Sequence, residues 1–181
     1  LNAAANALSG LAAALLVFAA AYAVSRSSLL PLREITALGT LAHTSRDEIA
    51  RATRAAAAGN FLAADLGAIR GALEQLPWVR RVQVRRVWPD RLEVALEEHV
   101  ALARWGETGL VNTHGERFTA TSAEPLPVFA GPAGAEAEVT RRYRRFVELL
   151  APVGETPERV ILTSRYAWQL RLAGGLQLEL G

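Results

Sequence analysis

The sequence predicts an α+β protein with a single N-terminal transmembrane helix, a β-α-α-β-β unit and a mixed β-rich unit with one long helix. Three observations lead to this prediction. Residues 7–24 form an 18-residue stretch without a charge. Apolar residues alternate on both sides of the turn sequence "WPDR", which is typical of a β-hairpin. Short alternating runs flank one strongly helical stretch, as expected for a sheet that packs against a helix.

The composition limits the possible function classes. The chain of 181 residues has 20 basic side chains, all arginine, against 18 acidic ones, so its formal net charge is only +2. A nucleic-acid-binding protein usually shows a larger excess of positive charge. Cysteine is absent, which excludes disulfides and zinc sites built from thiolates. We therefore expect no nucleic-acid partner, while the cellular compartment stays open.

The apolar N-terminal segment predicts a transmembrane helix over residues 1–25. As a helix, residues 7–24 extend about 27 Å at about 1.5 Å per residue, close to the thickness of a bilayer core. A cleaved signal peptide is the main alternative, because "AYA" at residues 21–23 has the small-x-small pattern of a cleavage site. A buried alanine-rich helix is a third reading, but it needs a partner surface on all sides. We therefore expect the lipid bilayer to contact residues 7–24.

A connector is predicted at residues 26–32, where Pro31 prevents the helix from continuing. Arg26 and Arg33 follow the apolar segment, and nothing basic precedes it. Taken alone, these charges place the C-terminal part of the chain in the cytoplasm under the positive-inside rule. Large domains cross membranes despite their charge, so charge alone leaves the orientation open.

Residues 33–100 are predicted to form the β-α-α-β-β unit. The run "EITAL" at residues 34–38 predicts its first strand. Ser45, with Glu48 three residues later, has the pattern of a capping box that begins a helix. Asp65 is the expected N-cap of a second helix. The apolar stripe of that helix comprises Leu66, Ile69, Leu73 and Leu76.

A β-hairpin with charged outer positions is predicted at residues 76–99. The predicted cross-strand pairs are Trp88–Leu92, Arg86–Val94 and Val84–Leu96. On the outer face, arginines and glutamates alternate as solvated partners. Arg86 is the exception, because its parity places it with Val84 on the inward side. Since a buried charge is unfavourable, we expect its guanidinium to leave the core near the turn and to be available to a partner.

Residues 101–181 predict the second, mixed β-rich unit. The runs "ALARW" and "GLVNTHGERF" alternate and turn at Gly106 and Gly115. A helix follows at "EAEVTRRYRRFVELLAP", and its four neighbouring arginines are interpreted as a solvated face. The last predicted strands are "ERVILT", "YAWQLRLA" and "LQLELG", of which the final two form a hairpin.

Patterns that indicate catalysis are absent from the sequence. His43, His99 and His114 are far apart and lack companion acids at metal-ligand spacing. No phosphate-binding glycine loop, dinucleotide fingerprint or nucleophile elbow occurs. Glu97 and Glu98 alternate faces on a strand, so they do not form a carboxylate pair. We therefore expect a protein that is not an enzyme, with no catalytic residue, cofactor or metal.

Several segments together resemble the FtsQ family of cell-division proteins from Gram-negative bacteria. They are "PLREI", "HTSRDEI", "GNFLAADL", "LPWVRRVQVRRVWPDRLEVALEEHVALARW", "LVNTHGERF" and "RYAWQLRL". The resemblance covers almost the whole chain. It implies that residues 33–100 are a POTRA domain and that residues 101–181 are the β domain that follows it. Members of the family continue with another helix and more strands, so the resemblance implies a chain truncated at its carboxy terminus.

The resemblance also implies a function and partners. It implies a membrane-anchored divisome scaffold of the inner membrane, with its N-terminus in the cytoplasm and most of the chain in the periplasm at the septum. The implied partners are FtsB and FtsL, together with FtsW, FtsI and FtsK. Recruitment positions of the family match Arg81, Val84 and Arg86, and Arg165 in "TSRYAW" resembles a residue that pairs with an acid of FtsB. The main FtsB-binding strand of the family lies beyond residue 181.

Two alternatives remain open on the sequence alone. A POTRA subunit of outer-membrane assembly or secretion would share the β-α-α-β-β unit but carry a cleaved signal and a β-barrel. A nucleic-acid binder would use the basic runs "RRVQVRR" and "RRYRR". In the plainest interpretation, the same arginines serve only solubility and strand pairing.

Overall fold

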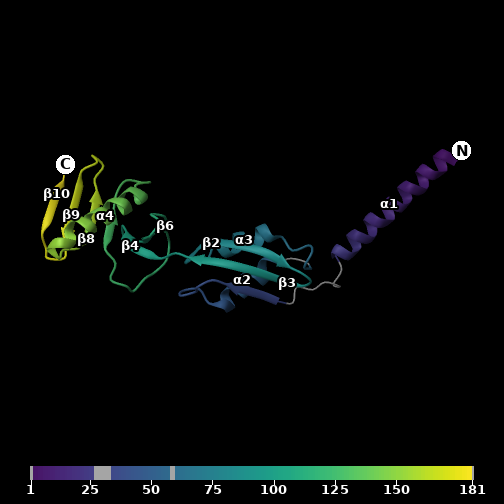
Figure 1. Ribbon diagram of the computed structural model, residues 1–181, viewed down its shortest axis with the longest axis horizontal. Coiled ribbons are helices and arrows are strands. Elements are labelled where there is room, and N and C mark those ends of the chain that lie inside the picture. Colours follow the sequence, from purple (N-terminus) through teal and green to yellow (C-terminus); the bar gives the residue numbers. More distant parts are fainter. Residues whose placement is uncertain (1, 27–33, 58–59, 181) are drawn as a thin grey trace. The chain divides into compact units, whose positions relative to one another are not determined.

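The protein is described by a computed structural model that covers residues 2–26, 34–57 and 60–180. The chain divides into two compact units, Leu1–Glu98 and His99–Gly181, and each has its own sheet (Figure 1). The predicted α+β class is confirmed. Apart from Arg26, the connector predicted at residues 26–32 lies outside the described residues.

Helix α1 spans Asn2–Arg26, which agrees with the predicted N-terminal helix. Its apolar side chains at six positions are each between 59% and 72% exposed: Leu8, Leu11, Leu15, Leu16, Val17 and Phe18. Within the described ranges, no helix combines the length and the apolar character that crossing a membrane requires. The predicted transmembrane span is therefore not confirmed.

The first unit has the predicted β-α-α-β-β order after α1. Its elements are β1 (Glu34–Leu38), α2 (Arg46–Ala56), α3 (Leu66–Glu74), β2 (Val79–Val87) and β3 (Arg91–Glu98). The strand order is β1-β3-β2, with β1 parallel and β2 antiparallel to the central strand β3. Both helices contribute to one core with the sheet, in which Ile49, Ile69, Leu73, Leu92 and Val94 have no exposed surface.

The predicted helix caps are confirmed. The Ser45 side chain accepts a 3.1 Å hydrogen bond from the backbone N–H of Glu48. Asp65 Oδ1 accepts two, from Gly67 N at 2.8 Å and from Ala68 N at 3.1 Å. These bonds satisfy N–H groups that have no partner inside the helix, and they explain where α2 and α3 begin.

The hairpin register differs from the prediction by two residues. Val84 pairs with Val94, Val82 with Leu96, and Arg86 with Leu92. A shift of two residues keeps every side chain on its predicted face, because the side-chain period of a strand is two. The predicted faces are therefore correct although the predicted pairs are wrong. The predicted pairs leave residues 89–91 between the strands and the observed pairs leave residues 88–90, so the turn has the same length but lies one residue earlier in the chain.

The second unit contains a seven-stranded sheet and one long helix. Its elements are β4 (Ala101–Trp105), β5 (Gly109–Asn112), β6 (Arg117–Phe118), β7 (Val128–Ala130), α4 (Glu136–Leu150), a short 3-10 turn (Ala151–Val153), β8 (Pro157–Leu162), β9 (Trp168–Leu172) and β10 (Gln177–Leu180). The strand order is β10-β9-β8-β7-β4-β5-β6. Helix α4 buries Val139 and Phe146 in a core with Phe129, Val160 and Trp168, so it covers one face of the sheet.

The turn between β5 and β6 is built around the buried side chain of Asn112. Its Oδ1 accepts hydrogen bonds from His114 N at 2.8 Å and Glu116 N at 2.9 Å. Its Nδ2 lies 2.7 Å from Glu116 Oε2 and 2.9 Å from His99 Nδ1. The His99 ring stacks on Phe118 with centroids 4.1 Å apart. The sequence "NTHG" is thus a structural turn, as predicted, and Asn112 satisfies its backbone groups from inside.

Candidate functional site

Strand β2 forms one edge of the first unit's sheet, and no described residue pairs with its outer side. Arg81 lies on this strand, opposite Glu97, with an exposed side chain. Glu97 accepts instead a 2.6 Å hydrogen bond from Arg80 Nη1. The side chain of Arg81 makes no hydrogen bond or ion pair within the described part of the chain. A sheet edge with an uncommitted arginine is suited to pairing with an added strand.

A small open groove of about 220 Å³ lies beside Arg81 on the outer face of this sheet. Gly39, at the end of β1, closes one side of it with a φ of 131°. The other lining residues come from all three strands: Leu38, Gln83, Ala95, Leu96 and Glu97. The groove therefore offers apolar surface next to the exposed strand edge.

The structure does not bring the three predicted recruitment residues to one face. Arg81 is on the outer face, whereas Val84 is half-buried and packs against the core between sheet and helices. Arg86 shares the face of Val84, and its guanidinium binds three backbone carbonyls. Nε donates to Phe61 O at 3.0 Å, and Nη2 donates to Leu62 O at 3.2 Å and to Ala64 O at 2.6 Å.

Arg86 is exposed, as expected, but its guanidinium is already bound to three backbone carbonyls. Its guanidinium leaves the core near the turn, as expected, but it then tethers the loop that precedes α3. Sequence reasoning missed this role because the acceptors are backbone carbonyls, which carry no residue-specific signal.

Arg165 lies in the second unit, at the turn between β8 and β9, and its side chain is exposed. The turn is held by Thr163 N bonding to Ala167 O at 2.9 Å and by Tyr166 N bonding to Thr163 O at 2.9 Å. Tyr166 has a φ of 62° and is 72% exposed. Arg165 makes no hydrogen bond or ion pair with any described residue. The turn therefore presents an arginine and a tyrosine side by side to solvent, which are residue types enriched at binding hot spots.

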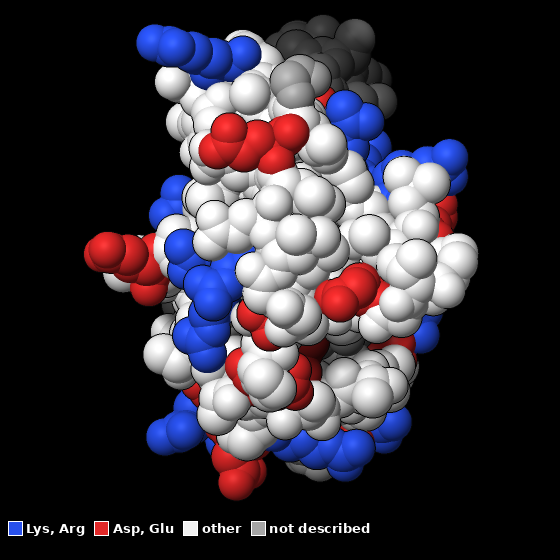
Figure 2. Space-filling model, turned by 90° about the vertical axis from the view of Figure 1, so that its left-hand side faces the viewer, with Lys and Arg blue, Asp and Glu red and all other residues white. Residues whose placement is uncertain are grey.

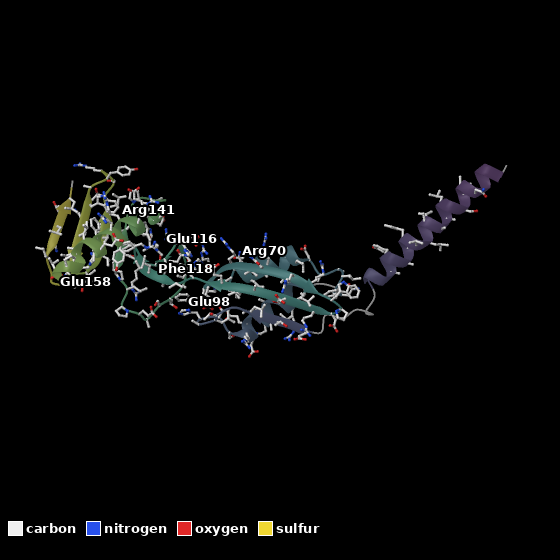
Figure 3. All side chains as sticks on the ribbon, viewed as in Figure 1. Arg70, Glu98, Glu116, Phe118, Arg141 and Glu158 are labelled. Atoms are coloured by element: carbon white, nitrogen blue, oxygen red, sulfur yellow. The ribbon has the colours of Figure 1, made fainter. Side chains whose placement is uncertain are left out.

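Glu98, labelled in Figure 3, is a buried carboxylate whose role the sequence did not reveal. It accepts backbone hydrogen bonds from Ala42 N at 2.8 Å, His43 N at 3.1 Å and Thr44 N at 2.7 Å. Burial by itself raises the pKa of Glu98, but these hydrogen bonds outweigh it and lower the pKa below its ordinary value of 4.5. The end of β3 thus holds the loop that leads into α2.

The four neighbouring arginines of α4 are exposed, as predicted, and three of them also contact other residues of the second unit. Arg142 lies over the Trp168 ring, 5.1 Å from its centroid. Arg144 donates to the carbonyl of Thr113, and Arg145 forms an ion pair with Glu148 at 3.1 Å. Only Arg141 of this group, labelled in Figure 3, has no partner among the described residues. Three of these four exposed arginines therefore have partners within the second unit.

The described residues contain no metal-binding cluster. Among them, no group of three His, Cys, Asp or Glu residues is placed to hold a metal ion. His43 contacts Glu98 at 3.5 Å and stacks on Trp78, so it belongs to the loop anchor. Figure 2 shows basic and acidic side chains interspersed on one face of the molecule. Such a surface is unlike the continuous basic field that a nucleic-acid backbone selects.

Comparison with known proteins covers both units. Residues 30–99 match the family described as "POTRA domain, FtsQ-type", and residues 103–181 match "Cell division protein FtsQ/DivIB, C-terminal". The "Cell division protein FtsQ" of Burkholderia pseudomallei is 44% identical over 184 residues, which cover 100% of this chain and 74% of that protein.

Two further proteins of the same description are also similar. That of Nitrosospira multiformis is 44% identical over 158 residues, which cover 84% of this chain and 67% of that protein. That of Escherichia coli is 35% identical over 158 residues, which cover 84% of this chain and 57% of that protein. The resemblance stated from the sequence motifs is thereby confirmed.

Proposed function

The chain belongs to the FtsQ family of cell-division proteins, and from this we propose that it is a membrane-anchored divisome scaffold. In this role it links early and late cell-division proteins through protein–protein contacts in the periplasm. The observation that carries the proposal is the match of FtsQ-type families to both units, over residues 30–99 and 103–181. A POTRA subunit of secretion or outer-membrane assembly is less well supported, because the second unit also matches FtsQ/DivIB.

Residues 7–24 are proposed as the single membrane anchor, with the N-terminus in the cytoplasm and the bulk of the chain in the periplasm. Support comes from the absence of charge in this segment and from the exposed leucine, valine and phenylalanine side chains on α1. Such side chains are unfavourable in water and favourable in lipid. The anchor keeps the chain in the inner membrane, from which it concentrates at the septum.

Residues 33–100 and 101–181 are proposed as the two interacting domains. For the first, the open edge of β2 and the uncommitted Arg81 favour recruitment of a partner such as FtsK, FtsW or FtsI. Val84 and Arg86 contribute by shaping this strand from its inner side. For the second, the exposed turn at Arg165 favours a contact with an acidic group of FtsB, with FtsL as a further partner. Neither role requires catalysis, a cofactor or nucleic acid.

The test is division-site recruitment in Escherichia coli cells depleted of their own FtsQ. A fluorescent protein is fused to the N-terminus of the chain and followed through the division cycle. A band of fluorescence at the constriction supports the scaffold, and uniform fluorescence around the envelope contradicts it. The variant Arg81→Glu is expected to weaken the band without changing the amount of folded protein.

The membrane anchor is tested separately in the same cells. The double variant Leu15→Arg, Leu16→Arg places two charges in the apolar segment, at a cost of about 2.5–3.5 kcal/mol each. It is expected to leave the membrane fraction after an alkaline wash, whereas the unchanged chain stays in that fraction. An unchanged chain that is released by the wash contradicts the anchor but leaves the division-site test standing.

A further inference from the structure

Two arginines lie directly opposite each other in the sheet of the second unit. Arg159 of β8 pairs with Arg171 of β9 in the antiparallel register, and both side chains are exposed. Cross-strand neighbours of this kind have Cβ atoms about 5 Å apart, and like charges at this spacing destabilise a sheet. The pair is therefore unfavourable for folding unless something else shares the charge.

Several other arginines on the sheets have acidic partners, but the side chains of these two have none among the described residues. Arg85 forms an ion pair with Glu93 at 2.6 Å, and Arg91 forms one with Glu34 at 3.0 Å. Within residues 60–180, the side chains of Arg159 and Arg171 make no hydrogen bond or ion pair. Glu158 and Glu179 are exposed nearby, yet neither is paired with these guanidinium groups.

Grooves adjoin the arginine pair on both sides. The larger is an open groove of about 600 Å³, with one wall formed by the segment Pro125, Leu126, Pro127 and Val128. Tyr143 and Pro157 also line it. The smaller groove, of about 270 Å³, is lined in part by Ile161, Gln169 and Leu178. Arg159 and Arg171 line both grooves, so the two cations stand between two partly apolar depressions.

We propose that Arg159 and Arg171 form a docking site for an extended, acidic segment of a partner protein. A carboxylate of the segment lies between the two guanidinium groups and accepts hydrogen bonds from both. An apolar side chain next to that carboxylate enters the groove along Pro125–Val128, and the chain continues toward the smaller groove.

An acidic peptide segment is proposed as the ligand because its negative charge complements the two guanidinium groups. Two adjacent guanidinium groups offer up to ten N–H donors and no acceptor, so they match an anion with several acceptor oxygens. A free phosphate would satisfy the charge but would leave the proline-rich wall empty. Arginine pairs and apolar grooves together are typical of peptide recognition. The site is separate from Arg165 and from the β2 edge, so it is a second docking surface of the second unit.

The probe is a fluorescent peptide of about eight residues, with two adjacent glutamates flanked by leucine and proline. Its affinity for the full chain in detergent is measured by fluorescence anisotropy. The control peptide has glutamine in place of each glutamate. The acidic peptide is expected to bind about tenfold more tightly than the control peptide, and more weakly as salt is added.

The double variant Arg159→Ala, Arg171→Ala is expected to lose that tenfold preference. Arg141→Ala, which removes another arginine without a described partner, is the matched control and should bind the peptide as the unchanged chain does. Thermal unfolding of each variant separates a binding defect from misfolding. Removing one arginine, in Arg171→Gln, is expected to raise the melting temperature because it relieves the like-charge contact.

Three results would overturn the site. They are equal binding of both peptides, an unchanged preference in the double variant, and no binding of the acidic peptide up to about 1 mM. Displacement of the peptide by an equal concentration of inorganic phosphate would also contradict it, since that outcome indicates a simple anion site. None of these measurements depends on membrane insertion or on septal recruitment. A negative result for the peptide site therefore leaves the proposed scaffold role standing, and the reverse also holds.

Discussion

The guanidinium of Arg86 is hydrogen-bonded to the backbone carbonyl of Ala64, with Nη2 and O 2.6 Å apart. Ala64 immediately precedes Asp65, the N-cap of α3. Arg86 therefore connects the end of the hairpin to the beginning of the second helix. A charged donor on a partly buried carbonyl is among the stronger hydrogen bonds in a protein. A substitution of Arg86 therefore removes a structural contact of the first unit and is expected to change its stability.

Arg86→Ala is expected to destabilise the first unit by about 1.5–3 kcal/mol, because it leaves several carbonyls without their charged donor. Arg85→Ala is the matched control, since Arg85 is on the same strand but pairs with Glu93 at the solvent side. We expect that control to cost less than about 1 kcal/mol. Urea unfolding of both variants measures the difference. Equal destabilisation would show that the loop does not depend on Arg86.

Glu98→Gln is expected to reduce the stability of the first unit at neutral pH and to flatten its acid dependence. The folded pKa of Glu98 lies below its ordinary value of 4.5, so its ionised form stabilises the folded state above that pH. This contribution is lost as the pH falls through the folded pKa. Unfolding midpoints at pH 7 and at about pH 3 test the sign. The unfolding midpoints of the variant and of the unchanged chain should differ at pH 7 and become equal in acid.

Gly39→Ala is expected to destabilise the first unit, and Gly71→Ala is expected to stabilise it. Gly39 has a φ of 131°, and a Cβ atom there would collide with the carbonyl oxygen of Leu96. Gly71 lies inside α3, where a Cβ atom would meet nothing within 4 Å. Alanine is favoured over glycine in a helix by up to about 1 kcal/mol. Opposite shifts of melting temperature confirm this, whereas a stable Gly39 variant contradicts the close contact.

Asn112→Asp is expected to destabilise the second unit although it changes the shape very little. The amide Nδ2 that donates to Glu116 is replaced by an oxygen, so two acceptors face each other in a buried site. We expect a loss of about 1–3 kcal/mol. Adding Glu116→Gln restores a donor and should recover part of the stability. A double-mutant cycle measures the coupling energy between Asn112 and Glu116. Strictly additive losses of stability would contradict a direct interaction between them.

Arg165→Glu is expected to weaken binding to FtsB at least tenfold if the turn between β8 and β9 contacts an acid of that partner. Stability should change little, because Arg165 has no partner among the described residues. Calorimetric titration with FtsB measures the affinity, and Arg141→Glu serves as the control for general charge effects. An unchanged affinity removes Arg165 from the binding surface.

Much of the fold could be predicted from the sequence because its signals are local. Ser45 and Asp65 mark helix starts through bonds to residues two or three positions away, and the chain order β-α-α-β-β follows from such signals. The period-two pattern in the hairpin placed each side chain on the correct face. The register, however, depended on where along the chain the turn lies, and the prediction placed the turn one residue too late, which shifts the pairing by two.

The candidate sites could be predicted only in part. Arg81 and Arg165 were named from the family resemblance; both side chains are exposed without a described partner, and their binding roles stay predictions. Val84 and Arg86 were named with them, but Val84 packs against the core and the exposed Arg86 is bound to loop carbonyls. The roles of Glu98 and Asn112 were missed, since each side chain binds backbone N–H groups that any residue can supply.

The amino-acid sequence by itself determined the family, the order of helices and strands, and the faces of the hairpin, because these depend on periodicity and on short-range bonds. Only the tertiary structure decided which arginines are available to partners. Arg86 is occupied by carbonyls more than 20 residues away, while Arg159 and Arg171 are brought together by the pairing of β8 with β9. The sequence does not reveal which acceptors an arginine meets, because folding brings those acceptors from distant positions to within hydrogen-bonding distance.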